Sequence, residues 1–316
     1  MKHFISAHDS VNPHQLVQEA LQVKQNPYNF PELGKNRTIG LLFFNSSLRT
    51  RLSTQKAAMN LGLQVMVMNI GSEGWALEYE DGTVMNGTSV EHVKDAAAVI
   101  GVYCDIIAIR CFPSLQDRTA DYSEMVLQQF IKFSNKPIVS LESATLHPLQ
   151  SLADLITIQE HKKTDKPKIV LTWAPHIKAL PQVVANSFSQ WVLKAGYDLT
   201  ITHPEGFELS EEFTNGATVE YDQEKALQDA DFVYVKNWSS YKDYGKVAVG
   251  HDDWMLTDEK METTNGGKIM HCLPVRRNLE VSDELLDGDN ALVLQQAENR
   301  IYAAQVVLKK ILEANF

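Results

Sequence analysis

The sequence contains few cysteines and no long apolar run. Its three cysteines, Cys104, Cys111 and Cys272, are odd in number and lack the paired spacing of zinc sites, which argues against a disulfide framework and indicates a reducing compartment. No apolar stretch approaches the roughly 20 residues of a membrane span, and residues 1–15 lack the apolar core of a signal peptide. We therefore predict a cytoplasmic protein with no membrane partner.

Two further absences exclude classes of ligand. The net charge is −11 and no block of lysine or arginine occurs, which argues against a nucleic-acid partner because nothing would neutralise the phosphates. No G-x-G-x-x-G follows any predicted strand, so the dinucleotide fingerprint of a dehydrogenase is missing. Any anion site in this acidic chain must be a local positive pocket.

The pattern that is present alternates strands and helices. Hydrophobic residues make up 44% of the 316 residues, enough for one large or two medium domains. Strands are predicted at residues 39–44, 64–70, 105–110, 137–141, 168–173, 197–203, 231–235, 268–270 and 291–294, and helices lie between most of them. This alternation predicts an α/β fold with a doubly wound parallel sheet in each half.

Residues 38–62 predict a buried strand, a tight turn and a helix. Ser47 stands where an N-cap is expected, and Gly62 is a typical C-cap residue. Apolar residues recur at helical spacing, at Leu48, Leu52, Met59 and Leu61. Because Ser47, Arg49 and Thr50 fall on the first helical turn, where free N–H groups favour an anion, they predict a phosphate cradle. The alternative is an N-cap serine followed by solvated arginines.

Residues 71–87 form a long Gly-rich loop that carries Trp75. A loop of this length is more often functional than a mere connection. For Trp75 itself, local packing against the loop is the alternative to a role in a site. After it, Thr88 and Glu91 match a capping box and predict a helix to about Val102.

Polar residues follow one predicted strand after another. They are Ser47 with Arg49, Arg110, Glu142 with His147, His176, His203, Lys236, and His271 with Cys272. One such residue is usually a helix cap or part of a solvated loop. Seven strand ends of this kind predict a cleft between two domains, beyond the carboxyl ends of the strands.

Three short motifs resemble those of the aspartate/ornithine carbamoyltransferase family. They are Ser47-Leu48-Arg49-Thr50, His147-Pro148-Leu149-Gln150 and His271-Cys272-Leu273-Pro274. The resemblance spans nearly the whole chain and is closest to the branch that carbamoylates N-acylated ornithine. It implies a carbamoyl-phosphate-binding domain at residues 1–150, joined by a C-terminal helix at 299–316, and an acylornithine-binding domain at 151–298. It also implies a knot near the proline-bearing loop 173–186, a homotrimer, and no cofactor or metal.

The resemblance implies roles for the donor side of the site. Residues implied to hold carbamoyl phosphate are Ser47, Leu48, Arg49, Thr50, Arg110, His147, Gln150, Cys272, Leu273 and Arg300, with Trp75 donated by a neighbouring subunit. Catalysis is assigned to Arg49, Arg110, His147, Gln150 and Cys272, the last through its backbone carbonyl. The residues themselves leave alternatives open: a structural role for His147, and a thiol nucleophile at Cys272.

The acceptor side is implied in the same way. Glu142, His176, Lys236 and Arg276 match contacts to the acylornithine, and surface solvation is the alternative for Lys236 and Arg276. Ornithine-specific relatives carry a Ser-Met-Gly loop, which is absent here. Acetyl-specific relatives carry a glutamate near position 90, where this chain has Val90, which favours a succinyl group. The alternatives are N-acetylornithine, ornithine, or a paralogue that binds anions without catalysis.

Overall fold

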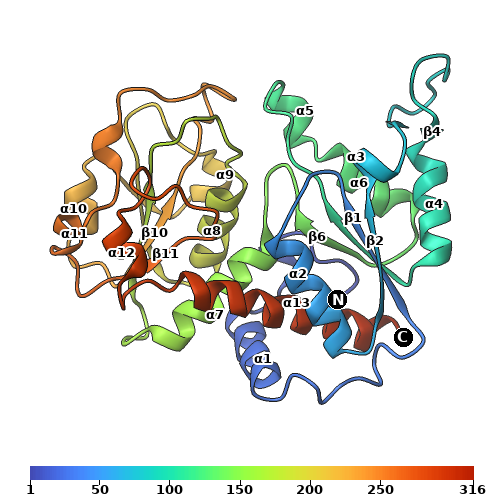
Figure 1. Cartoon of the computed structure of the whole chain (residues 1–316), viewed down its shortest axis with the longest axis horizontal. Helices are drawn as coiled ribbons and strands as arrows, with labels where there is room; N and C mark the ends of the chain where they lie inside the picture. The colour runs from blue at the N-terminus through green and yellow to red at the C-terminus, as the bar shows by residue number, and fades with distance from the viewer.

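The computed structural model describes residues 1–316 and has two lobes, each built around a parallel sheet (Figure 1). The first sheet has the order β2-β1-β5-β6 and consists of β1 (Thr38–Phe43), β2 (Gln64–Asn69), β5 (Ile106–Arg110) and β6 (Ile138–Glu142). The second has the order β11-β10-β7-β8-β9 and consists of β7 (Lys168–Trp173), β8 (Asp198–Thr202), β9 (Thr218–Glu220), β10 (Phe232–Lys236) and β11 (Lys268–Met270). The predicted doubly wound α/β architecture is confirmed.

Each sheet has one point where the strand order reverses. In the first sheet this point lies between β1 and β5, and Phe43 is paired with Arg110 there. In the second sheet it lies between β7 and β10, and Trp173 is paired with Lys236. Loops diverge from such a point at the carboxyl ends of the strands and leave a crevice between them. The two crevices belong to the two lobes that face each other in Figure 1.

Helices cover the sheets and connect the lobes. The longer ones are α1 (Pro13–Gln25), α2 (Arg49–Asn60), α4 (Val93–Tyr103), α6 (Met125–Phe133), α7 (Pro148–His161), α8 (Val183–Lys194) and α13 (Val293–Asn315). The short ones are η1 (Ala7–Asp9), α3 (Ile70–Glu73), α5 (Arg118–Tyr122), α9 (Glu211–Thr214), α10 (Gln223–Leu227), η2 (Asp252–Trp254), α11 (Asp258–Met261) and α12 (Asp283–Asp287). Helix α13 packs against α1, α2 and α7, which returns the chain to the first lobe (Figure 1).

Several local predictions were wrong. Helix α2 begins at Arg49 and Leu48 occupies the N-cap position, so Ser47 does not cap it. Thr88 and Glu91 form no capping box, because Glu91–His92 is the short strand β4, paired with β3 (Leu77–Glu78), and His92 caps α4 by accepting from the N–H of Lys94. In the predicted strand 291–294 only Ala291 makes a bridge, to Ile269, and α13 begins at Val293.

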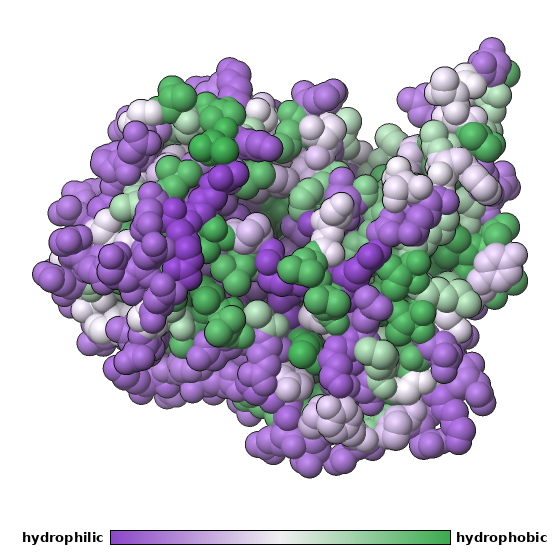
Figure 2. All heavy atoms as spheres, viewed as in Figure 1, coloured by the Kyte–Doolittle hydropathy of each residue, from purple (hydrophilic) through white to green (hydrophobic).

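The apolar residues that recur at helical spacing from Leu48 to Leu61 divide between the surface and the core. Leu48, Leu52 and Met59 are exposed, whereas Ala57 and Ala58 face the core. Figure 2 shows apolar side chains at the surface over this helix. Leu61, the last of the four apolar residues at helical spacing, is fully buried at the C-cap. Helical spacing therefore predicted the helix but not which of its apolar residues are buried. Separately, no helix of the fold combines the length and apolar character needed to cross a bilayer.

Candidate active site

A cavity of about 610 Å³ lies where the two lobes meet. Its lining comes from both halves of the chain: Ser46, Ser47, Leu48, Arg49, Thr50, Arg110, Phe112, Glu142, His147, Gln150, His176, Leu180, Pro181, Val183, Val184, Lys236, Asn237, Cys272, Leu273, Pro274, Val275, Arg276, Glu280 and Arg300. Most of the residues predicted from the sequence are thus brought together. Of the predicted strand-end residues, buried His203 and His271 do not line the cavity, and His203 contacts the carbonyl of Pro204.

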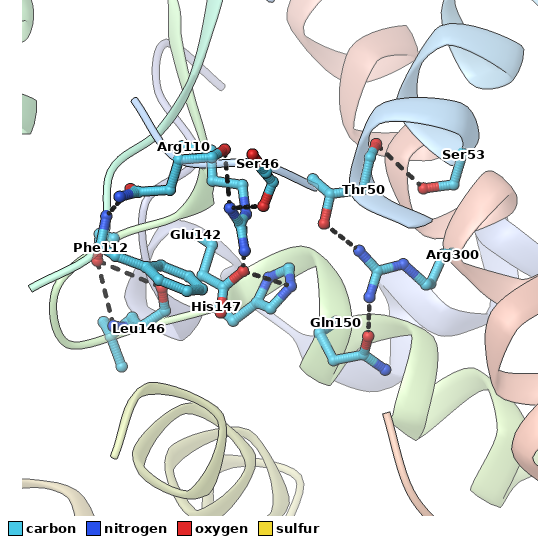
Figure 3. A network of polar contacts seen from close by, with 12 residues as sticks. Ser46, Thr50, Ser53, Arg110, Phe112, Glu142, Leu146, His147, Gln150 and Arg300 are labelled. Carbon is cyan, nitrogen blue, oxygen red and sulfur yellow. Dashed lines mark hydrogen bonds and ion pairs between the residues drawn. The ribbon is translucent and has the colours of Figure 1, made fainter. Parts of the chain in front are cut away.

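Arg110 fixes the turn that leads into α2. Its Nη1 donates to the carbonyl oxygens of Asn45 at 3.0 Å and Ser46 at 2.6 Å, and its Nε donates to Glu142 Oε2 at 3.1 Å (Figure 3). The guanidinium also lies over the ring of Phe112, 4.0 Å from its centroid. Since the first turn of α2 contains no acidic residue, its free N–H groups and the nearby cations attract an anion.

Arg300 reaches the same end of the cavity from α13. Its Nη2 donates to Thr50 Oγ1 at 2.5 Å and its Nη1 donates to Gln150 Oε1, while its buried Nε has no partner (Figure 3). Burial lowers the pKa of Arg300, yet a guanidinium stays protonated in proteins. The C-terminal helix therefore adds a fixed positive charge beside the start of α2.

His147 is held in its neutral form. Burial, helped by the charges of Arg300 and Arg110, keeps the pKa of His147 well below its usual range. Its Nε2 lies 3.6 Å from Glu142 Oε2, and its buried Nδ1 has no partner. Burial raises the pKa of Glu142 against the opposing charge of Arg110. A neutral imidazole can donate one N–H to a substrate oxygen without carrying charge.

The second lobe contributes a rigid turn after β11. The N–H of Leu273 donates to His271 Nδ1 at 2.9 Å, so Nε2 of the neutral ring carries the proton and donates to Glu280 Oε2 at 2.9 Å. Desolvation raises the pKa of the Cys272 thiol. The turn therefore presents protonated Cys272 and the backbone of Leu273 at the cavity.

Two cations, Arg276 and Lys236, line the predicted acceptor side of the cavity. Arg276 Nε donates to His176 Nε2 at 3.1 Å, which makes that nitrogen the acceptor of the ring. Buried Lys236 donates to Asn237 Oδ1 at 2.6 Å. With the arginines of the first lobe, these side chains make the cavity locally positive in a chain of net charge −11. The cavity can therefore hold a strongly anionic ligand at one end and carboxylates at the other.

Trp75 and Val90 lie away from this cavity. They are 55% and 65% exposed, and Trp75 Nε1 donates to Glu91 Oε2 at 2.8 Å. The segment between α3 and α4 that carries them projects from the first lobe (Figures 1 and 2). Neither residue lines the cavity of its own chain.

Sequence reasoning missed several lining residues. Phe112 and Glu280 lie in irregular segments where nothing in the sequence distinguishes them. Leu180, Val183 and Val184 fall in the proline-bearing loop 173–186, where their apolar side chains alone indicate no ligand contact. Asp154 lies directly behind the cavity, and its position in the sequence could have indicated that it is close to the site. It is the one charged residue in the run 148–159, and it lies four residues after Gln150, on the same helix face.

Asp154 should make stability depend on pH. Burial raises the pKa of its carboxyl to about 7, against amide donation from Gln296 and Gln150. Because an unfolded aspartate titrates near pH ~3.9, the folded state keeps a proton that the unfolded chain has lost, and the free energy of unfolding falls as pH rises through this window. The full effect is about 4 kcal/mol. Asp154→Asn removes this dependence. The free energy of unfolding, measured in urea from pH 4.5 to 8, should therefore fall for the wild type relative to the variant as the pH rises. The same pH dependence in both proteins would contradict this.

Comparison with known proteins agrees with this geometry. Residues 2–160 match the model of the aspartate/ornithine carbamoyltransferase carbamoyl-P binding domain, and residues 181–311 match that of the Asp/Orn binding domain. The chain is 49% identical to N-succinylornithine carbamoyltransferase of Bacteroides thetaiotaomicron over 99% of both chains. It is 34% identical to N-acetylornithine carbamoyltransferase of Xanthomonas campestris pv. campestris, over 98% of this chain and 97% of that one.

Solved structures extend the likeness to three dimensions. A variant of N-acetyl-L-ornithine transcarbamylase, complexed with carbamyl phosphate and N-succinyl-L-norvaline, superposes with a TM-score of 0.93 at 33% identity and covers 98% of this chain and 100% of that one. The same enzyme complexed with acetylcitrulline also has a TM-score of 0.93. Fold, motifs and full-length similarity agree, and the chain belongs to the aspartate/ornithine carbamoyltransferase family.

Proposed function

We propose that this protein transfers the carbamoyl group of carbamoyl phosphate to the side-chain amine of N-succinyl-L-ornithine. The products are N-succinyl-L-citrulline and phosphate, and the reaction serves arginine biosynthesis in the cytoplasm, where the three free thiols stay reduced. The observation that carries the proposal is the meeting of Arg49, Arg110 and Arg300 with the N-terminus of α2 at one end of the cavity. The relative at 49% identity is named for this activity.

The phosphate of the donor is assigned to the first-lobe end of the cavity. Ser47, the backbone N–H of Leu48, Arg49 and Thr50 surround it, with Arg110 and Arg300 as further cations. Guanidinium groups suit this task because their planar fork matches phosphate oxygens in pairs. Since Arg110 and Arg300 are already fixed by neighbouring groups, little ordering remains to be done when the ligand binds.

The carbamoyl group is assigned to the space beside His147 and Gln150. A neutral imidazole N–H aimed at the carbonyl oxygen would stabilise the tetrahedral oxyanion, and one such donor contributes roughly 3 kcal/mol. The side chain of Gln150, held by Asp154 and Arg300, bounds the space for the carbamoyl group. The carbonyl oxygens of Cys272 and Leu273 accept from the carbamoyl NH2. The raised pKa of Cys272 keeps its thiol protonated, which disfavours the nucleophile reading.

The acceptor is assigned to Glu142, His176, Lys236 and Arg276. Lys236 and Arg276 are available for its carboxylates. A free alkylamine titrates near pH ~10.4, so fewer than about one molecule in a thousand is neutral at pH 7. The surrounding cations favour the neutral amine, and a phosphate oxygen or water accepts the proton as the amine attacks the carbon.

Val90 is proposed to select the acyl group. The crystallised variants of N-acetyl-L-ornithine transcarbamylase with N-succinyl-L-norvaline carry alanine, proline or serine in place of one glutamate. Here a glutamate at position 90 would repel the succinyl carboxylate in a partly dry pocket. Val90→Glu should therefore lower kcat/KM for N-succinylornithine by about 10- to 100-fold relative to N-acetylornithine. Competition between the two acceptors measures the ratio of their kcat/KM values. An unchanged ratio in Val90→Glu would show that Val90 does not select the acyl group.

Because Val90 and Trp75 project away from their own cavity, we propose a homotrimer in which each subunit completes its neighbour's site. Exposed Leu48, Leu52 and Met59 on α2, and Met66 on the edge strand β2, support an apolar contact between copies. A closed ring of three identical chains is built from head-to-tail contacts, in which one surface of each copy meets a different surface of the next.

Mixing two inactive variants tests the shared site. Trp75→Ala damages the neighbour's site, whereas Arg300→Met damages the chain's own site. Random reassembly pairs an intact cavity with an intact Trp75 in roughly a quarter of sites, so activity should return after the two proteins are unfolded and refolded together. The matched control refolds each variant alone. A mixture that stays inactive would show that Trp75 is not shared.

The overall proposal is tested by phosphate release from carbamoyl phosphate with N-succinylornithine, N-acetylornithine, ornithine and aspartate in parallel. We expect phosphate only when an acceptor is present and fastest with N-succinylornithine. Preference for N-acetylornithine or ornithine would move the protein to another branch of the family. Binding of carbamoyl phosphate without turnover would identify a non-catalytic paralogue.

A further inference from the structure

Asp154 is a fully buried carboxylate with no role in the mechanism above. It lies on α7 one turn after Gln150 and does not line the cavity. Its Oδ1 accepts from Gln150 Nε2 at 2.7 Å and from Gln296 Nε2, on α13, at 2.8 Å. Its Oδ2 has no hydrogen-bond partner in the structure. One oxygen thus joins two amides that come from different helices.

This contact determines which way each amide faces. Because Asp154 Oδ1 acts as an acceptor toward both glutamines, both turn their NH2 groups toward it and their Oε1 atoms away. Gln150 Oε1 then accepts from Arg300, and Gln296 Oε1 accepts from the backbone N–H of His271 at 2.8 Å. A flipped amide would oppose two oxygens and leave a buried donor without a partner.

The two amides support opposite sides of the cavity. Gln150 joins Arg300, which holds Thr50 at the start of α2 (Figure 3). Gln296 holds His271, whose ring accepts from Leu273. The orientation imposed at Asp154 therefore reaches both the arginine end of the cavity and the Cys272–Leu273 turn.

We propose that Asp154 is a positioning residue for carbamoyl transfer, acting through the amide orientations of Gln150 and Gln296. The inference rests on the proposed function and deepens it. Asp154 touches neither substrate. It fixes the side chain and the backbone turn that flank the carbamoyl group, where a displacement of about 1 Å costs roughly 100-fold in rate.

The decisive comparison is between two replacements of similar size. Asp154→Asn keeps a carbonyl oxygen that can accept from both glutamines, whereas Asp154→Leu has no acceptor. We expect Asp154→Leu to lower kcat by about 100-fold and to raise the KM for carbamoyl phosphate, with the KM for N-succinylornithine unchanged. Asp154→Asn should stay within about tenfold of the wild type. Equal losses in both variants, or wild-type kcat in Asp154→Leu, would overturn the inference.

A matched control separates positioning from damage to α7. Thr157 is buried on the same helix and contacts α13 through Asn299, not through the glutamines. Thr157→Val should keep wild-type kcat and KM values. If Asp154→Leu does not fold, Gln296→Leu interrupts one arm without changing α7, and its kcat should fall at least tenfold; a wild-type kcat in Gln296→Leu would equally overturn the inference.

Binding measured without turnover tests the positioning role of Asp154 separately from the proposed function. Calorimetry with carbamoyl phosphate should show weaker binding in Asp154→Leu and near wild-type binding in Asp154→Asn. This pattern would support positioning at the donor site even if the wild type released no phosphate, a result that would overturn the proposed function alone. Equal affinity in all three proteins would refute positioning while leaving the proposed function intact.

Discussion

Arg300→Met is expected to lower kcat/KM for carbamoyl phosphate by about 10³- to 10⁴-fold. The variant removes a buried charge and its bonds to Thr50 and Gln150, and each hydrogen bond to a charged group contributes about 1.5–3 kcal/mol. Methionine fills much of the volume of the arginine stem, so the loss reports charge and hydrogen bonding more than packing. Initial rates of phosphate release at varied carbamoyl phosphate measure the effect.

Arg277 supplies the control for this prediction. It is an exposed arginine paired with Asp283 and Asp287, outside the cavity. Exposed ion pairs contribute little to stability, so Arg277→Met should change neither kcat nor KM. If Arg300→Met kept wild-type affinity for carbamoyl phosphate, the phosphate would not bind beside α13, and the assignment of Arg300 to the phosphate site would be wrong.

His147→Ala should lower kcat by about 10²- to 10³-fold, the cost of removing one donor from an oxyanion site. Because the pKa of His147 lies well below its usual range, the ring is already neutral at pH 6 and loses no proton between pH 6 and 8. The wild-type and variant profiles should therefore have the same shape in that range and differ only in height. The measurement is kcat at saturating substrates from pH 6 to 8.

His161 is the matched histidine for that experiment. It lies at the other end of α7 and contacts the carbonyl of Thr157, so His161→Ala should keep wild-type kcat. An acid limb near pH 6.5 that disappeared in His147→Ala would contradict the neutral-donor role, since it would mean that the ring titrates during catalysis.

Regular elements and strand-end residues could be predicted because their signals are local. The continuous apolar run before Ser47 identified β1, and alternation along the chain identified both parallel sheets. Arg110, Glu142 and Lys236 end their strands, so the geometry of parallel sheets was enough to group them. The three motifs then predicted the family.

The remaining features depend on contacts between distant segments. Phe112 and Glu280 line the cavity only because the lobes meet there. Spacing alone could not show which residues of α2 are buried: Ala57 and Ala58 face the core, whereas Leu48 and Leu52 are exposed. The domain boundary at residue 150, the knot and the trimer stay predictions, since each depends on chain threading or on a second copy.

The position of α13 has a consequence for biosynthesis of the protein. Gln296 and Arg300, which complete the cavity, are translated long after Thr50, Gln150 and Asp154, with which they form their contacts. A nascent chain still missing α13 lacks both a part of the hydrophobic core and the donor site. Translation products truncated before residue 293 should therefore be catalytically silent, and a separately supplied peptide spanning Val293–Asn315 is the natural candidate for restoring them.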